Sequence, residues 1–213
     1  MDIKLYYSPG SCSLAPHILL EEVGVPFTTE VVSVPEAKTQ QPEHLQRNPK
    51  GRIPVLLVDG VYYTEVPAIS YWIAGQKREL NLFPSEFERA VRLLEWFNWL
   101  TGTVHAVAFG EIWRPQRFVR DIALFPQITS AGRENALEAC EFIETQLKGR
   151  TWAVPDAFSM IDPYLLVYYR WGYRIDISMR ERFPAWTEII ERIAQRPSVS
   201  RALAREGITI WPA

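Results

Sequence analysis

The sequence predicts a small domain that mixes strands and helices, followed by an all-helical domain. Strand-like alternation ends by about residue 64, and from Pro84-Ser85 onward the apolar residues recur at helical spacing. The stretch before Pro84 is polar, so we expect the domains to comprise residues 1–79 and 80–213. The 213 residues are 47% hydrophobic and 13% aromatic, which is enough for an extensive core.

The elements of the first domain follow from alternation, helical spacing and turn residues. Pro9-Gly10 ends the opening strand, Gly24 ends the first helix, Asp59-Gly60 is a hairpin signal, and Pro67 opens a later helix. The first strand-helix-strand unit predicts a parallel pair with a right-handed crossover. Residues 35–47 are polar and hard to assign. The predicted strands are residues 3–7, 27–34, 53–58 and 61–64, in a mixed four-stranded sheet with the order βαβαββα to residue 75.

Apolar stripes predict the helices of the second domain. A long helix is expected to end at Trp113-Arg114-Pro115, and a second, from about residue 130 to 148, to end at Gly149. Cys140 lies on the apolar face of this second helix, which favours an inert core thiol. Ser159 and Asp162 form a capping-box pattern ahead of another helix. Further helical stretches are residues 164–171 and 184–196, with a short segment through Leu203 leading to the tail.

Composition excludes several classes of protein. The net charge of -2 and the isoelectric point near 6.0 give no general attraction to nucleic acid or acidic membranes. A pattern of arginines interleaved with tyrosines and Trp171 within residues 168–182 therefore indicates a solvated helical face. The longest apolar runs fall far short of the ~20 residues that cross a membrane. The N-terminus lacks a signal-peptide pattern, and two distant cysteines make no disulfide framework, so we expect a cytoplasmic protein. Three histidines and two cysteines without ligand spacing argue against a metal site.

Cys12 stands where the first strand turns into the first helix, within Ser11-Cys12-Ser13. Backbone N–H groups and the dipole at a helix start favour an anion. An ordinary cysteine, with a pKa near ~8.5, is about 3% thiolate at pH 7, and lowering that pKa by ~2 units would make it mostly thiolate. The position thus predicts a reactive thiol or a thiol-binding pocket. The alternative is a small buried residue at a strand-helix corner.

Several motifs, in this order and spacing, resemble those of cytosolic glutathione transferases, most closely the bacterial beta class. The resemblance extends over nearly the whole chain. Its motifs are Ser8-Pro9-Gly10-Ser11-Cys12-Ser13-Leu14-Ala15-Pro16-His17-Ile18, Asn48-Pro49-Lys50-Gly51-Arg52-Ile53-Pro54-Val55-Leu56, Thr64-Glu65, Glu95-Trp96-Phe97-Asn98 with His105, Phe158-Ser159-Met160-Ile161-Asp162-Pro163-Tyr164-Leu165, and Arg192-Ile193-Ala194-Gln195-Arg196-Pro197.

The resemblance implies a thioredoxin-like first domain that binds glutathione. It implies a cis Ile53-Pro54 bond, with the backbone of Ile53 pairing with the tripeptide like a sheet edge. Glu65 would be a buried partner for the ligand ammonium, and the backbone N–H at Val66 would hold the adjacent carboxylate. Cys12 and Ser11 would be catalytic, and glutathione would be the co-substrate with no metal.

The resemblance assigns further residues to the second domain. His105 lies seven positions after Asn98, which is two turns of an α-helix, so we expect both to face the cleft between the domains. His105 would then lie near the glutathione sulfur, and Asn98 would bind the tripeptide. The electrophile pocket would be lined by Phe109, Trp113 and Phe118.

Two positions depart from the family pattern. Val66 stands where serine or glycine is usual, which removes a hydroxyl that would cap the helix and touch the ligand. Ala106 follows His105 where beta-class members often have lysine, so one basic contact to glutathione is missing.

The favoured function is that of a homodimeric glutathione transferase acting on hydrophobic electrophiles. Thiol-disulfide exchange through Cys12 is a further activity, and glutathione would have to complete it because no second cysteine lies three positions on. The alternatives are a non-enzymatic, starvation-protein type of regulator and a glutathione-dependent isomerase. The isomerase is the weaker of these, since the arginines that follow its Ser-Cys-Ser signature are absent.

Overall fold

The computed structural model describes residues 1–155 and 157–211, which form two compact units. The first, the sheet unit, comprises Met1–Phe83, Phe158–Arg170 and the C-terminal segment from Ile190. The second, the helical unit, comprises Pro84–Ala157 and Trp171–Ile189. The packing units do not follow the order of the chain, and the contiguous domains 1–79 and 80–213 remain a prediction.

The sheet unit contains the mixed four-stranded sheet that the sequence predicts. The strands β1 (Ile3–Tyr7), β2 (Thr28–Val31), β3 (Val55–Val58) and β4 (Val61–Thr64) lie in the order β2-β1-β3-β4. β1 and β2 are parallel, whereas β1–β3 and β3–β4 are antiparallel. β2 is shorter than the predicted strand at residues 27–34, although Val32 still donates a backbone hydrogen bond to Tyr7 at 2.7 Å.

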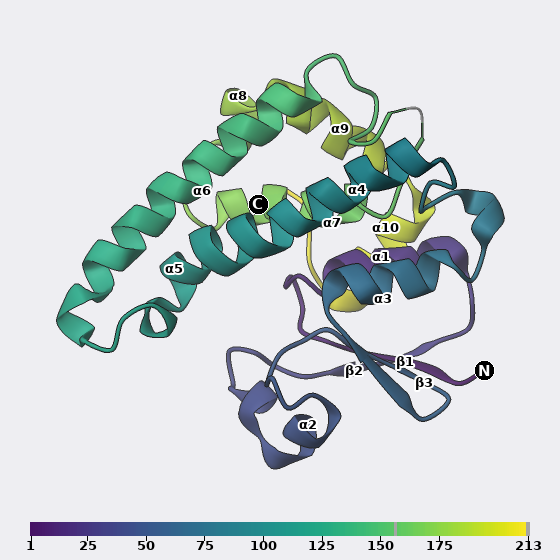
Figure 1. Ribbon diagram of the computed structural model, residues 1–213, viewed down its shortest axis with the longest axis horizontal. Coiled ribbons are helices and arrows are strands. Elements are labelled where there is room, and N and C mark those ends of the chain that lie inside the picture. The colour runs from purple at the N-terminus through teal and green to yellow at the C-terminus, as the bar shows by residue number, and fades with distance from the viewer. Residues whose placement is uncertain (156, 212–213) are drawn as a thin grey trace. The chain divides into compact units, whose positions relative to one another are not determined.

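Helices cover the sheet on both sides (Figure 1). α1 (Leu14–Val23) and α3 (Val66–Ala74) lie side by side on one face, and α2 (Pro42–Arg47) lies on the other side. α1 is buried almost all round, because α10 (Pro197–Glu206) packs against it as well. α2 fills part of the stretch that the sequence left unassigned, and α10 is a full helix where only a short segment was predicted.

In the helical unit one long helix and its antiparallel neighbour pack closely (Figure 1). The first is continuous through α4 (Phe87–Trp99), the π-helix η3 (Leu100–Phe109) and α5 (Gly110–Trp113), and it ends at Trp113 as predicted. Its neighbour, α6 (Phe125–Leu147), starts earlier than residue 130. The close approach depends on Gly132, since a Cβ there would lie 2.9 Å from the carbonyl oxygen of Ala108.

α7 (Asp162–Tyr173) and α9 (Pro184–Ala194) each begin in one unit and end in the other. Asp162 accepts hydrogen bonds from the Ser159 backbone N–H at 2.7 Å and from its hydroxyl at 3.0 Å. The carboxylate half of the predicted capping box is therefore present, whereas the serine hydroxyl donates to the carboxylate instead of accepting from the backbone. The remaining short elements are α8 (Met179–Arg182) and the 3₁₀ turns Lys38–Gln40, Arg78–Leu80, Pro115–Arg117 and Ile122–Leu124.

Cys140 is a buried core thiol on α6, and burial raises its pKa to about 12.

Within residues 1–155 and 157–211, the structure contains no helix with the length and apolar character needed to span a membrane.

Candidate glutathione site

The corner between β1 and α1 is held by a group of serine side chains. Ser13 Oγ donates to the carbonyl of Ser8 at 3.2 Å and accepts from the Ser8 N–H at 3.2 Å. Ser11 Oγ lies 2.7 Å from Ser13 Oγ and accepts from the Ser13 backbone N–H at 3.2 Å. Because the Ser13 proton goes to Ser8, the Ser11 hydroxyl is the donor to Ser13. The Ser11 hydroxyl is thus oriented by Ser13. One of its two acceptor lone pairs is not used within this group of serines.

A buried carboxylate on α10 holds the same corner from behind. Glu206 Oε2 accepts the Gly10 backbone N–H at 2.8 Å, and Oε1 lies 2.8 Å from Nδ1 of His17. The side chains of His17 and Glu206 are fully buried. Gly10 has a φ of +71°, a conformation that a side chain would disfavour. The residue immediately before Ser11-Cys12 is thereby fixed by α10.

The structure places Cys12 before the helix and inside the protein. α1 begins at Leu14 with Ser13 as its N-cap, and Cys12 is only 5% exposed. Burial raises the pKa of the Cys12 thiol to about 12. The expectation of a lowered pKa is therefore wrong in the structure described. The protonated thiol instead donates to the carbonyl of Ile53 at 3.5 Å, which brings Cys12 and Ile53 together as part of one site.

The Ile53-Pro54 bond is cis, as predicted. Pro54 is buried and Ile53 is half-buried, so part of Ile53 remains accessible beside the Cys12 thiol. β3 begins at Val55, directly after this pair, so the two residues immediately precede a central strand of the sheet.

Glu65 lies at the start of α3 but is not buried. Its backbone φ is +75°, which is rare for a residue with a side chain, and such strain concentrates at functional sites. The side chain is 51% exposed and forms an ion pair with Lys50. The expectation of a buried charge is therefore wrong: Glu65 is an accessible carboxylate that already has an internal cationic partner.

Val66 is the first residue of α3 and is buried. The first N–H groups of a helix have no acceptor within the helix, and Pro67 contributes none, so the N–H groups of Val66 and Ala68 are the donors at this end. They follow Glu65 directly. A carboxylate partner thus stands beside anion-binding backbone donors at one corner of the sheet unit.

The helical unit holds the other predicted site residues, and the helical spacing argument that connected two of them does not apply. Asn98 is exposed near the end of α4, and His105 is half-buried within η3. A π-helix closes hydrogen bonds from i to i+5, so each turn contains more residues than in an α-helix. Seven positions are then less than two turns, and the argument that Asn98 and His105 share a face does not hold.

His105 belongs to an aromatic cluster with Trp171 at its centre. The Trp171 ring lies 5.0 Å from the ring of His105, 5.1 Å from that of Phe109 and 5.0 Å from that of Trp113, measured between centroids. Two of the three predicted electrophile-pocket residues, Phe109 and Trp113, therefore lie together. Phe118, the third, is 42% exposed, and its ring tip lies 3.4 Å from where a Cβ on Gly110 would be.

Comparison with known proteins identifies the family. The sequence profile "Glutathione S-transferase, N-terminal domain" matches residues 1–75, and "Glutathione S-transferase, C-terminal domain" matches residues 126–197. The chain belongs to the glutathione S-transferase family. It is 30% identical to glutathione S-transferase GstA of Escherichia coli O157:H7 over 209 residues, which cover 97% of this chain and 100% of the relative.

Solved structures agree with this family. A glutathione transferase homologue from Sulfitobacter with bound glutathione is 27% identical, with a TM-score of 0.90 over 97% of this chain and 99% of the other. A bacterial beta class glutathione S-transferase from Sphingomonas chungbukensis is 32% identical, with a TM-score of 0.83 over 97% of this chain and all of the other. The similarity to beta-class members that the motifs indicate is therefore confirmed.

Sequence reasoning missed two residues of this glutathione S-transferase's aromatic cluster. From the sequence we expect Trp171 in an apolar helical stretch, and Trp171 and Arg174 in a pattern typical of a solvated face. The solvated-face prediction is wrong for Trp171, which is 3% exposed. The Arg174 guanidinium lies 5.2 Å from the Trp113 ring centroid. The only sequence signal was the three-residue spacing of Trp171 and Arg174, which places them on one side of α7 and the turn that follows.

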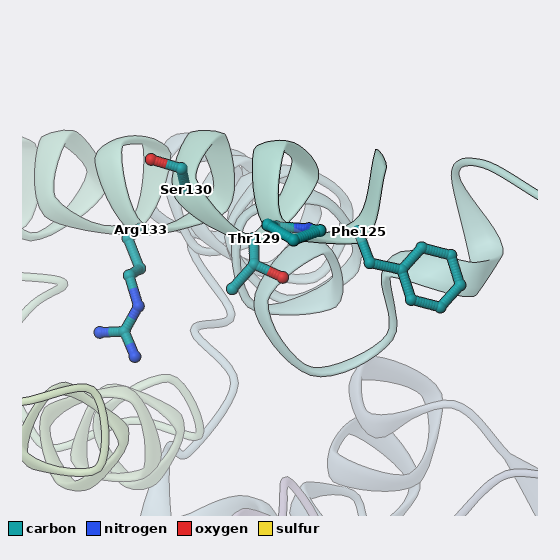
Figure 2. A pocket seen from close by; sticks show the side chains of 5 residues that line it. Phe125, Thr129, Ser130 and Arg133 are labelled. Carbon is teal, nitrogen blue, oxygen red and sulfur yellow. The ribbon is translucent and has the colours of Figure 1, made fainter. Parts of the chain in front are cut away.

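A surface hollow of about 490 Å³ lies elsewhere, along α6 (Figure 2). Its labelled side chains, Phe125, Thr129, Ser130 and Arg133, stand on successive turns of the helix. None of the predicted site residues lines it, and Arg133 there donates to the carbonyl of Ile175 at 3.0 Å. The volume of this hollow is therefore no indication of the glutathione site.

Among the residues that the structure describes, no cluster of three or more His, Cys, Asp or Glu side chains could hold a metal ion.

The pKa of Cys12 leads to a prediction about its reactivity. With a pKa of about 12 the thiol is roughly one part in 10⁵ thiolate at pH 7. In the native protein at pH 6.5 we expect iodoacetamide to modify Cys12 as slowly as Cys140, with the rate rising about tenfold per pH unit. Peptide mapping by mass spectrometry would measure both rates, and the urea-unfolded protein is the control. Modification of native Cys12 at the unfolded rate would contradict the buried, protonated thiol.

Proposed function

We propose that this protein is an enzyme that joins the thiol of glutathione to small hydrophobic electrophiles. The observation that carries the proposal is the corner at Glu65, where an accessible carboxylate adjoins the first N–H groups of α3. The γ-glutamyl end of glutathione carries an ammonium and a carboxylate on one carbon, and these need partners of opposite kinds side by side. Glu65 would bind the ammonium and the N–H of Val66 the carboxylate.

The cysteine unit of glutathione would pair with the backbone of Ile53 at the cis-proline corner. This is the proposed role of Ile53 and Pro54. The Cys12 thiol and the Ser11 hydroxyl lie at the neighbouring corner, and Cys12 already contacts Ile53. We propose that they solvate the glutathione sulfur as hydrogen-bond donors, for which the Ser11 hydroxyl must turn away from Ser13 and the single Cys12 S–H must turn away from the Ile53 carbonyl.

In the proposed reaction the glutathione sulfur is the nucleophile. Its thiol proton passes to solvent, the thiolate forms a carbon-sulfur bond with the electrophile, and a leaving group departs or a double bond takes up a proton. A protonated Cys12 suits this role, because a neutral S–H can donate to the thiolate. Exchange of disulfides through Cys12 needs the Cys12 thiolate instead, which burial disfavours.

The aromatic cluster of the helical unit is the proposed binding surface for the electrophile. Trp113 is half-buried and Phe118 is exposed, so these two rings are accessible. Phe109 is only 1% exposed and supports Trp113, from which its ring centroid lies 5.1 Å. His105 and Asn98 are assigned by the resemblance alone, and their roles stay proposals. A cytoplasmic location is also proposed, supported by the cytosolic family and by the two free cysteines in the described structure.

Glu65→Gln tests the glutathione site. The amide keeps the size of the side chain but loses the charge that attracts an ammonium. Because the Glu65 side chain is half exposed, we expect only about a 5- to 30-fold loss of affinity for glutathione, or ~1–2 kcal/mol. Calorimetry with glutathione would measure it, alongside retention on immobilised glutathione. Glu43→Gln is the matched control, because Glu43 is an exposed acid paired with Arg47 on α2. Equal affinity in the wild type and Glu65→Gln would contradict the site.

Cys12→Ser separates conjugation from disulfide exchange. The hydroxyl can still donate to the glutathione thiolate, so we expect conjugation to 1-chloro-2,4-dinitrobenzene to persist, while any reduction of a small disulfide that depends on Cys12 disappears. Cys140→Ala is the control for losing a buried thiol. Loss of conjugation in Cys12→Ser alone would contradict the donor role, because it would show that a hydroxyl at this position cannot replace the thiol. Glutathione binding without turnover of any electrophile would favour the non-enzymatic alternative.

A homodimer is proposed for the assembled protein. The helical unit exposes apolar side chains on neighbouring faces of α4, η3 and α6, among them Leu94, Val107 and Phe142. Burying such a face against a second copy is typical of symmetric dimers. Light scattering at micromolar concentration should give twice the 24.6 kDa chain mass, and Phe142→Glu should shift the mass toward one chain. A wild-type monomer would refute the proposal.

A further inference from the structure

Lys50 lies next to the corner where the γ-glutamyl end of glutathione is proposed to bind. Its ammonium forms an ion pair with Glu65 and donates to Thr64 Oγ1 at 2.8 Å. The turn that carries it is fixed, because the Lys50 N–H donates to Asn48 Oδ1 at 3.2 Å and the Gly51 N–H to the Asn48 carbonyl at 2.9 Å. A cation is therefore held beside the only side chain assigned to the ligand ammonium.

Glu65 can accept a second cation without releasing the first. An ionised carboxylate has two oxygens and about four lone-pair sites. Lys50 uses Oε1, and within the described residues no hydrogen bond is formed by Oε2. A ligand ammonium at Oε2 would leave Glu65 between two positive groups, so a further negative charge nearby would be stabilised. The α-carboxylate of the same γ-glutamyl group is that charge.

The chain also lacks one partner for that carboxylate. Val66 has no hydroxyl, and Pro67 has no N–H, so the start of α3 offers only the backbone donors of Val66 and Ala68. The Lys50 ammonium has three N–H donors. Two of them go to Glu65 and Thr64, which leaves one to serve an incoming anion.

We propose that Lys50 is a glutathione-binding residue, which keeps its contact with Glu65 and donates to the α-carboxylate of the γ-glutamyl group. This inference rests on the proposed function. Lys50, Glu65 and the two charges of the ligand then form a ring of alternating sign with no net charge. The lysine replaces the side-chain donor that Val66 cannot provide, and it adds specificity for ligands that carry both charges.

A simple competition between Lys50 and the ligand ammonium for Glu65 would have the opposite consequence. If Lys50 only occupies the ammonium site, its removal frees Glu65 and raises the affinity for glutathione. If Lys50 binds the carboxylate, its removal lowers the affinity, and the loss depends on the presence of that carboxylate in the ligand. The sign of the change and its ligand dependence therefore separate the two.

The test compares Lys50→Met and Lys50→Arg with the wild type by calorimetry, using two ligands. These are glutathione and its analogue without the α-carboxylate, 4-aminobutyryl-cysteinyl-glycine. We expect Lys50→Met to weaken glutathione binding about 10-fold but analogue binding less than 2-fold, and Lys50→Arg to retain most of the affinity for glutathione. Lys4→Met is the control, since Lys4 forms a comparable exposed pair with Glu30 in the same unit.

Three results would overturn the role of Lys50. Tighter glutathione binding by Lys50→Met would show that the lysine is a competitor. An equal loss for both ligands would show that it only supports the turn or Glu65. A larger loss of affinity for the analogue than for glutathione on Lys50→Met, each measured against the wild type, would place the lysine elsewhere on the ligand. If the wild type binds neither ligand, the proposed function itself fails, which distinguishes that failure from an error about Lys50.

Discussion

The buried carboxylate of Glu206 is the contact on which the geometry of the candidate site depends. One oxygen of Glu206 accepts a hydrogen bond from the Gly10 N–H, and the other lies 2.8 Å from Nδ1 of His17. Both oxygens of this fully buried side chain therefore have a polar partner. Removing one partner of such a buried pair typically costs about 3–5 kcal/mol, because the other is left without compensation. The last helix of the chain thus secures the first strand-helix corner, and the positions of Ser11 and Cys12 follow from α10 as much as from α1.

The chemistry of Cys12 is decided by two opposing effects, and burial is the larger. A helix N-terminus stabilises a negative charge by about 0.3–1 kcal/mol and at most ~2 kcal/mol, and the effect declines beyond the first turn. Cys12 precedes the N-cap Ser13, so it receives little of it. Full burial can shift a pKa by as much as 3–5 units in the direction of the neutral form. A pKa of about 12 is the result, and a donor role follows more naturally than a nucleophilic one.

Sequence patterns predicted the sheet because alternation and turn residues are local signals. The four strands and the end of the long helix at Trp113 agree with them, whereas the cis proline was implied only by the family resemblance. The state of Cys12 was not predictable, since burial depends on packing that no local pattern records. The π-helix at η3 was missed for the same reason: its sequence, Leu100–Phe109, fits an ordinary α-helix. The pairing of Lys50 with Glu65 joins residues 15 positions apart through the β3–β4 hairpin, which only the three-dimensional structure shows.

The exposure of Glu65 changes how affinity must arise at this site. An exposed ion pair such as Lys50–Glu65 contributes only about 0–1 kcal/mol, because water competes for both charges. A single carboxylate here therefore cannot supply micromolar affinity, which corresponds to about 8 kcal/mol. Binding must be the sum of many modest contacts along an extended tripeptide, from the Ile53 backbone to the N–H groups of α3. In such a site the hydroxyl that Val66 lacks is one contact among several, and a neighbouring lysine is able to replace it.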